Sequence, residues 1–144
     1  MMNKKPDNGP SGIVELTAVQ LSQAIHAREV SSVEVLDAYL AQVDRFNSQV
    51  NAIVAPMPRE DLKAQAAQLD EQMARGESKG VLHGFPQAPK DIMPAKGMVT
   101  TKGSPVFADQ VSAFDAIHFE RMRNSGAVFV GRTNSPEFGL GGHT

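Results

Sequence analysis

Apolar residues recur at three- and four-residue spacing in four stretches of the chain, and this spacing predicts four helices. We expect them at residues 17–28, 31–47, 58–75 and 115–124. The first two begin at a hydroxyl residue that is followed three positions later by Gln20 or Glu34. This spacing allows side chain and backbone to cap each other. Acidic pairs at residues 60–61 and 70–71 indicate the solvated face of the third helix.

Two short apolar runs lack helical spacing and predict β-strands. They are NAIVA at residues 51–55 and AVFV at residues 127–130. The second run is apolar throughout, which is typical of a strand that is buried on both faces. A predicted helix leads into it, and this order favours an α/β fold. Residues 81–103 are rich in proline and glycine and predict short strands and loops.

Composition and charge exclude several classes of function. Hydrophobic residues make up 41% and charged residues 21% of the chain, as in an ordinary globular protein. The formal charge is −2, so we expect neither nucleic acid nor a membrane surface as a partner. The absence of cysteine excludes thiolate nucleophiles and disulfides. The four histidines form no compact metal-binding motif, and we expect neither a metal nor a cofactor.

The two ends of the chain differ in character. Residues 1–14 are expected to form a flexible tail. They contain no apolar run of the kind that a secretory signal needs, and no stretch of the chain approaches the length of a membrane span. We therefore expect a cytoplasmic protein with a single domain at residues 15–144.

Lys90 is the candidate for chemistry that the residues themselves suggest. It lies among prolines in an apolar stretch. Burial there would favour the neutral amine, which can act as a base. Two alternatives stay open, because a typical lysine is solvated and because the neighbouring Asp91 would keep it charged. Pro89 lacks a backbone N–H and indicates a sheet edge or a bulge at this point.

A set of short motifs in the second half of the chain resembles the amidase signature family. The motifs are Gly84-Phe85-Pro86, Lys90-Asp91, Thr100-Thr101-Lys102-Gly103-Ser104, Gly131-Arg132-Thr133-Asn134 and Pro136-Glu137-Phe138. They follow the order and spacing of the family, and the similarity extends over residues 15–144. The resemblance implies an α/β fold in which these residues form the N-terminal segment of an α/β/α sandwich around a mixed sheet. The segment would be incomplete, because the family's domain continues beyond it.

The resemblance also implies an activity. Members of the family hydrolyse amide C–N bonds through a Ser–cis-Ser–Lys triad and an acyl-enzyme, without a cofactor. Lys90 matches their catalytic lysine. Thr101 and Ser104 are weaker candidates for lining the site, and turn-stabilising hydrogen bonds are the alternative for both. For Asn134 and Glu137 we expect a structural role.

The family's bridging serine and its nucleophile follow the Pro-Glu-Phe motif, and no serine of this chain matches either one. We therefore expect the complete protein to act on small-molecule amides and the 144-residue chain to be inactive alone. One alternative is a non-catalytic fragment or split-protein piece that binds a complementary chain, and a homodimer also stays open. A further alternative is one of the subunits of a tRNA-dependent amidotransferase.

Overall fold

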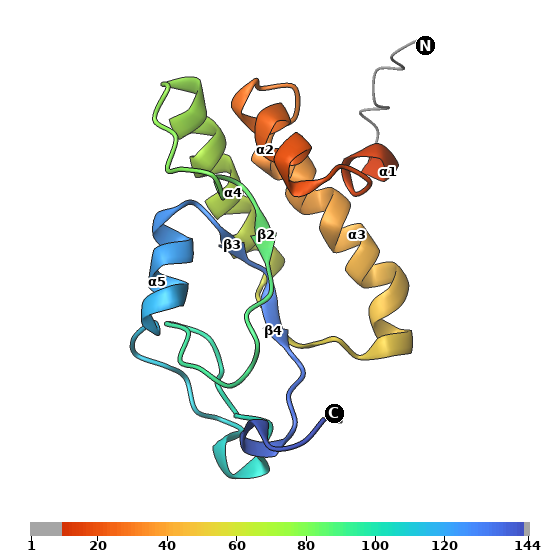
Figure 1. Cartoon of the computed structure of the whole chain (residues 1–144), viewed down its shortest axis with the longest axis vertical. Coiled ribbons are helices and arrows are strands. Elements are labelled where there is room, and N and C mark those ends of the chain that lie inside the picture. The colour runs from red at the N-terminus through yellow and green to blue at the C-terminus, as the bar shows by residue number, and fades with distance from the viewer. Residues whose placement is uncertain (1–9, 143–144) are drawn as a thin grey trace.

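The chain folds into helices and short strands, with three helices before the first strand (Figure 1). A computed structural model describes residues 10–142. Its helices and strands are α1 (Pro10–Ile13), α2 (Ala18–His26), α3 (Ser32–Val50), β1 (Ile53–Pro56), α4 (Arg59–Ala74), β2 (Pro86–Gln87), α5 (Ile117–Asn124), β3 (Val128–Phe129) and β4 (Gly131–Thr133). Two 3₁₀ helices, η1 (Pro105–Phe107) and η2 (Glu137–Gly139), complete the described part.

The starts of α2 and α3 are those that the sequence predicts. Thr17 and Ser31 are the N-caps, and each forms a capping box with the residue three positions later. At the second box the Ser31 hydroxyl accepts from the Glu34 N–H at 3.1 Å, and the Glu34 carboxylate accepts from the Ser31 N–H at 2.8 Å. The bond from the Ser31 backbone also lowers the pKa of Glu34. Loss of such a cap costs about 1 kcal/mol.

Asp70 of α4 provides a second cap for α3. Its carboxylate accepts hydrogen bonds from the backbone N–H groups of Ser32, at 2.6 Å, and Val33, at 3.2 Å. The first N–H groups of a helix have no partner within the helix, so an adjacent carboxylate is a favourable acceptor. The expectation of a purely solvated residue is therefore wrong for Asp70. It holds for Glu60, Asp61 and Glu71, which are exposed.

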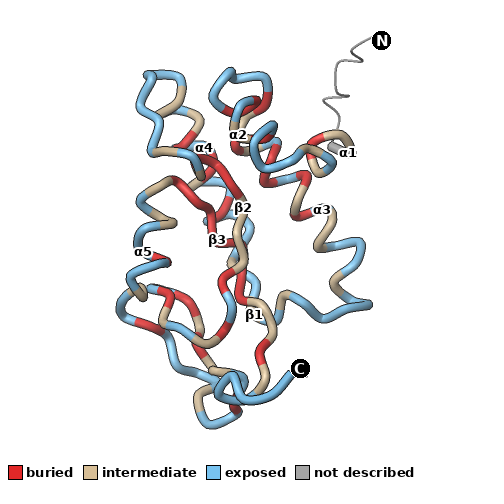
Figure 2. Tube along the Cα trace, in the orientation of Figure 1, coloured by how far each residue is buried: buried red, intermediate tan, exposed pale blue. Residues whose placement is uncertain are grey.

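Both faces of the β3 segment are covered by helices. Val128 and Val130 pack in one cluster with Leu36 of α3 and with Leu62 of α4. On the other face, Ala127 and Phe129 pack with Phe119 of α5. Successive residues of a strand point to opposite faces, which explains why the whole AVFV run is buried (Figure 2). The burial confirms the predicted strand.

The strands pair in both directions. β2 is parallel to β3, with Pro86 opposite Val128. β1 is antiparallel to β4, and its register shifts between Ile53 and Ala55. Strands of mixed direction between two layers of helices confirm the α/β class that the order of elements predicts.

The expected flexible tail at residues 1–14 needs correction at its C-terminal end. Residues 1–9 lie outside the described residues. Residues 10–13 form α1, and Ile13 is buried in a cluster with Leu21 and Val35. An apolar side chain in this position anchors the turn against α2 and α3, so the packed part of the chain begins before residue 15.

His83 is a buried histidine whose tautomer is determined by its two partners. Its Nε2 lies 3.0 Å from the Leu69 carbonyl, which can only accept, and its Nδ1 accepts from the Lys79 N–H at 3.1 Å. The ring is therefore neutral, with its proton on Nε2. Burial lowers the pKa of His83 below its usual value. Protonation of Nδ1 would place its N–H against the N–H of Lys79, with no acceptor between the two donors.

We expect the stability of the chain to fall as the pH drops below about 6.5, the pKa of an unfolded histidine. Below that pH the unfolded chain binds a proton at residue 83 that the folded chain resists, so the free energy of unfolding falls by at most about 1.4 kcal/mol per pH unit. Urea unfolding at several pH values measures this. The variant His83→Gln should flatten the dependence, whereas His118→Gln, at an exposed position, should leave it intact. Parallel curves for wild type and His83→Gln would contradict the assignment.

Candidate functional site

Lys90 lies in an extended segment that continues β2 and pairs with β4. The Thr133 N–H donates to the Pro89 carbonyl at 3.0 Å, and the Asp91 N–H donates to the Thr133 carbonyl at 3.1 Å. Lys90 and Thr133 thereby form a parallel bridge. Pro89 takes part in the ladder through its carbonyl, so its missing N–H interrupts no bond to this partner.

The side chain of Lys90 is exposed. Its Nζ donates to the backbone carbonyl of Asn134 at 3.2 Å. Residues 10–142 thus do not provide the buried, apolar environment considered for Lys90.

Asp91 points into the protein. Its carboxylate accepts from the Thr101 backbone N–H at 2.9 Å and from the Thr101 hydroxyl. It also lies 3.5 Å from Nη2 of Arg132. The partners of the Asp91 carboxylate are therefore Thr101 and Arg132.

Arg132 is fully buried, with 0% of its surface exposed. Its Nη2 donates to the Met93 carbonyl at 2.6 Å. Burial lowers the pKa of Arg132, and the charge of Asp91 opposes this shift. The sequence motif that contains Arg132 predicted no role for it. A charged residue two positions after the fully apolar run at residues 127–130 is the signal that could have indicated a buried ion pair.

Thr101 and Ser104 both make hydrogen bonds that stabilise loops. Thr101 binds Asp91 as described, and the Ser104 hydroxyl donates to Glu137 Oε1 at 2.7 Å. These bonds favour the structural alternative for the two hydroxyls. Asn134 accepts from the Ser135 N–H at 2.9 Å. Thr101 and Ser104 nevertheless line a cavity of about 410 Å³, together with Asp91, Asn134, Val54 and Pro105.

Gly103 allows the loop of residues 101–104 to approach the backbone after β4. A Cβ at this position would lie 2.4 Å from the Ser135 carbonyl oxygen, and the φ angle of +69° is one that side chains disfavour. We expect Gly103→Ala to lower the free energy of unfolding by more than about 1 kcal/mol. Gly97→Ala is the matched control, because its φ is +75° but nothing lies within 4 Å of the new Cβ. Denaturation should show a larger loss for Gly103→Ala, and equal losses would contradict the close approach.

Lys90 lies next to this cavity in the structure without lining it. The amine of Lys90 binds Asn134, which lines the cavity.

Among residues 10–142, no three acidic or histidine side chains come close enough to hold a metal ion. The helices of this same range also include none with the length and hydropathy that crossing a membrane requires.

Comparison with known proteins identifies relatives of nearly the whole chain. A glutamyl-tRNA(Gln) amidotransferase subunit from Streptomyces coelicolor is 36% identical over 134 residues, which make up 93% of this chain and 27% of that protein. An amidase from Pseudomonas putida is 41% identical over 132 residues, or 91% of this chain and 28% of that protein. The crystal structure of a peptide amidase from Stenotrophomonas maltophilia matches with a TM-score of 0.77 at 31% identity, and covers 86% of this chain and 26% of that one.

These matches cover similar shares of the relatives. The chain spans about a quarter of the length of the relatives that it matches. The family model for amidases matches residues 34–144, which include every motif named above. The chain therefore belongs to the amidase signature family.

Proposed function

We propose that this chain supplies the N-terminal part of an amide hydrolase, and that Lys90 is its catalytic lysine. The observation that carries the proposal is the position of Lys90. It is held by a strand pair, and its amine contacts the backbone of Asn134, a residue that lines a cavity of about 410 Å³. A nucleophilic serine and a bridging serine would come from the chain that follows residue 144 and would complete a Ser–cis-Ser–Lys triad.

In this proposal Lys90 moves protons and does not itself attack the substrate. Its neutral amine accepts a proton from the bridging serine, which in turn accepts the proton of the nucleophile. The nucleophile attacks the amide carbon, and the proton held by Lys90 passes to the leaving nitrogen, which departs as ammonia or an amine. Water then hydrolyses the acyl-enzyme. This role requires a neutral lysine. Cover by the following part of the protein would desolvate Lys90 and favour its neutral form.

Linear amides are the proposed substrates. The names of the relatives support this class, since they include an acylamidase from Rhodococcus erythropolis and a peptide amidase. We expect the complete protein to release ammonia or an amine from a panel of such amides, and the isolated 144-residue chain to release none. Turnover by the isolated chain would contradict the division of the triad. No turnover by the complete protein on any amide would contradict the function.

A second candidate function is that of one component of an amidotransferase. Several relatives are named as subunits of a glutamyl-tRNA(Gln) amidotransferase, with 36% to 40% identity. Such a protein would hydrolyse glutamine and pass the ammonia to a second substrate, with the help of partner proteins. Glutamine hydrolysis that requires added partner proteins would favour this candidate, whereas hydrolysis of simple amides by the protein alone would exclude it.

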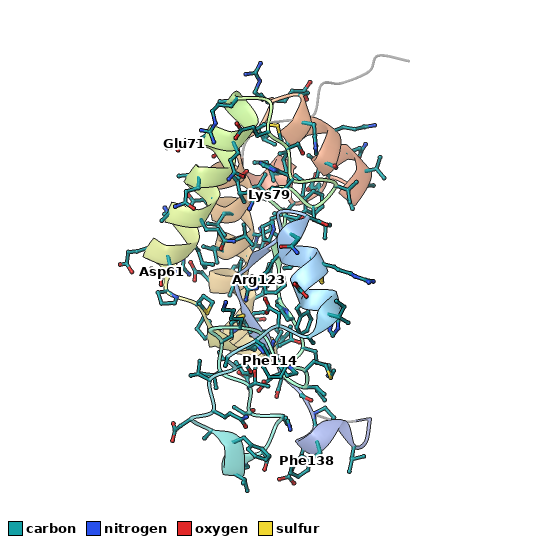
Figure 3. All side chains as sticks on the ribbon, turned by 90° about the vertical axis from the view of Figure 1, so that its left-hand side faces the viewer. Asp61, Glu71, Lys79, Phe114, Arg123 and Phe138 are labelled. Atoms are coloured by element: carbon teal, nitrogen blue, oxygen red, sulfur yellow. The ribbon has the colours of Figure 1, made fainter. Side chains whose placement is uncertain are left out.

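A third candidate is a non-catalytic piece that binds a complementary chain. Exposed apolar side chains support it, among them Phe138, with 49% of its surface exposed, and Leu140, with 78%. Phe138 lies at the end of the molecule far from Glu71 (Figure 3). We expect light scattering to show self-association of the isolated chain, because such surfaces associate. A monodisperse monomer would contradict this candidate.

A further inference from the structure

Asp91, next to Lys90, joins three segments of the chain through its side chain. The carboxylate binds the backbone N–H of Thr101 at 2.9 Å and lies 3.5 Å from Nη2 of Arg132. The same Nη2 donates to the carbonyl of Met93 at 2.6 Å. Asp91 and Arg132 thus connect the segment of Lys90, the loop of Thr101 and strand β4 behind the exposed amine.

This connection lies directly beside Lys90 in the chain. Neighbouring residues of an extended segment point to opposite faces, so a buried Asp91 turns Lys90 outward. The acceptor of the Lys90 amine, the Asn134 carbonyl, lies at 3.2 Å and follows Arg132 by two positions. The ion pair therefore holds both ends of the contact between Lys90 and Asn134.

Stability alone does not explain this ion pair. Arg132 is 0% exposed, and its Nε and Nη1 have no hydrogen-bond partner among the described residues. Desolvation of two charges often costs more than their attraction returns, and apolar residues of similar volume are then as stable or more stable. The guanidinium packs 5.6 Å from the centre of the Phe119 ring, but three of its N–H groups have no partner among the described residues. That cost points to a role outside folding.

We propose that Asp91 and Arg132 are positioning residues that hold Lys90 in the orientation needed for proton transfer. This inference rests on the proposed function of Lys90. Neither residue contacts the reacting atoms. Their effect passes through the backbone at residues 90–91 and through β4.

The test separates positioning from folding by means of a double variant in the complete protein. Asp91→Asn alone leaves the charge of Arg132 buried and unpaired, which is expected to destabilise the fold. Asp91→Asn combined with Arg132→Met removes both charges and should restore the melting temperature. We expect this double variant to keep KM within about twofold and to lose about 100-fold in kcat, because a small misplacement of a catalytic group has an effect of that order.

A second ion pair provides the control. Arg59 of α4 pairs with Asp44 of α3 at the surface. The double variant Asp44→Asn with Arg59→Met removes the same two charged groups from an exposed pair between helices, and kcat should stay at the wild-type value. A folded Asp91/Arg132 double variant with wild-type kcat would overturn the proposal.

A second readout separates failure of this inference from failure of the proposed function. If the complete wild-type protein hydrolyses no amide, the proposed function fails. Hydrogen exchange of the Asp91 and Thr133 amides in the chain still tests whether the Asp91–Arg132 pair holds the Lys90 segment on β4. Both amides form the hydrogen bonds between that segment and β4. We expect exchange at least tenfold faster in the Asp91/Arg132 double variant than in wild type. Unchanged exchange would overturn the positioning role whatever the activity.

Discussion

Lys90→Ala is expected to lower kcat of the complete protein on amides by about 10² to 10⁴-fold, the range for loss of a general base. The fold should be unaffected, because Lys90 is exposed and its amine makes one hydrogen bond, to Asn134. KM should change little, since the lysine acts on protons and not on the bound amide. Steady-state kinetics together with a melting temperature measures both effects.

Two further variants make the Lys90 test specific. Lys90→Arg retains a positive charge but has a side chain that stays protonated, so it should be as inactive as Lys90→Ala. Lys96→Ala removes another exposed lysine nearby in the sequence and should retain full activity. Activity of Lys90→Arg close to wild type would mean that charge, and not proton transfer, is the contribution of this residue.

Leu36→Ala is expected to lower the free energy of unfolding by about 2–5 kcal/mol, the usual cost of a large cavity in a core. Leu36 is 0% exposed and packs in one cluster with Leu62 and Val128. This cluster joins α3 and α4 to the strand that precedes β4. A total stability of about 5–15 kcal/mol is typical of a domain, so the loss is a large fraction of it.

Leu140→Ala is the matched control for Leu36→Ala. The side chain of Leu140 is 78% exposed, so its truncation should change the free energy of unfolding by less than about 0.5 kcal/mol. Urea unfolding of the variants measures the difference. Similar small losses in both would show that the helices do not pack on β3 as described.

Local patterns predicted most of the helices. The capping boxes at Thr17 and Ser31 involve residues three positions apart, and such short-range bonds can be read directly from a sequence. The ends of the helices were predicted less accurately. α3 continues to Val50, past the expected end near residue 47, and stops where Asn51 adopts a left-handed φ of 48°. An asparagine tolerates this conformation, but its neighbours decide whether it is used.

The site was only partly predictable because its contacts join distant segments. The motif match indicated Lys90 but not that it is exposed, since exposure depends on which segments of the chain cover it. The pairing of Asp91 with Arg132 joins residues of separate motifs. The cap that Asp70 provides for α3 is of the same kind. No local spacing signals such partners, and only the fold brings them together.

The central claim is that Lys90 serves a nucleophilic serine in the chain that follows residue 144. The most direct test is to treat the complete protein with a fluorophosphonate, which modifies activated serines, and to locate the label by mass spectrometry. We predict a label on a serine beyond residue 144 in wild type and a much slower reaction in Lys90→Ala. A label on a serine within residues 1–144, or equal labelling rates in the two proteins, would contradict the account.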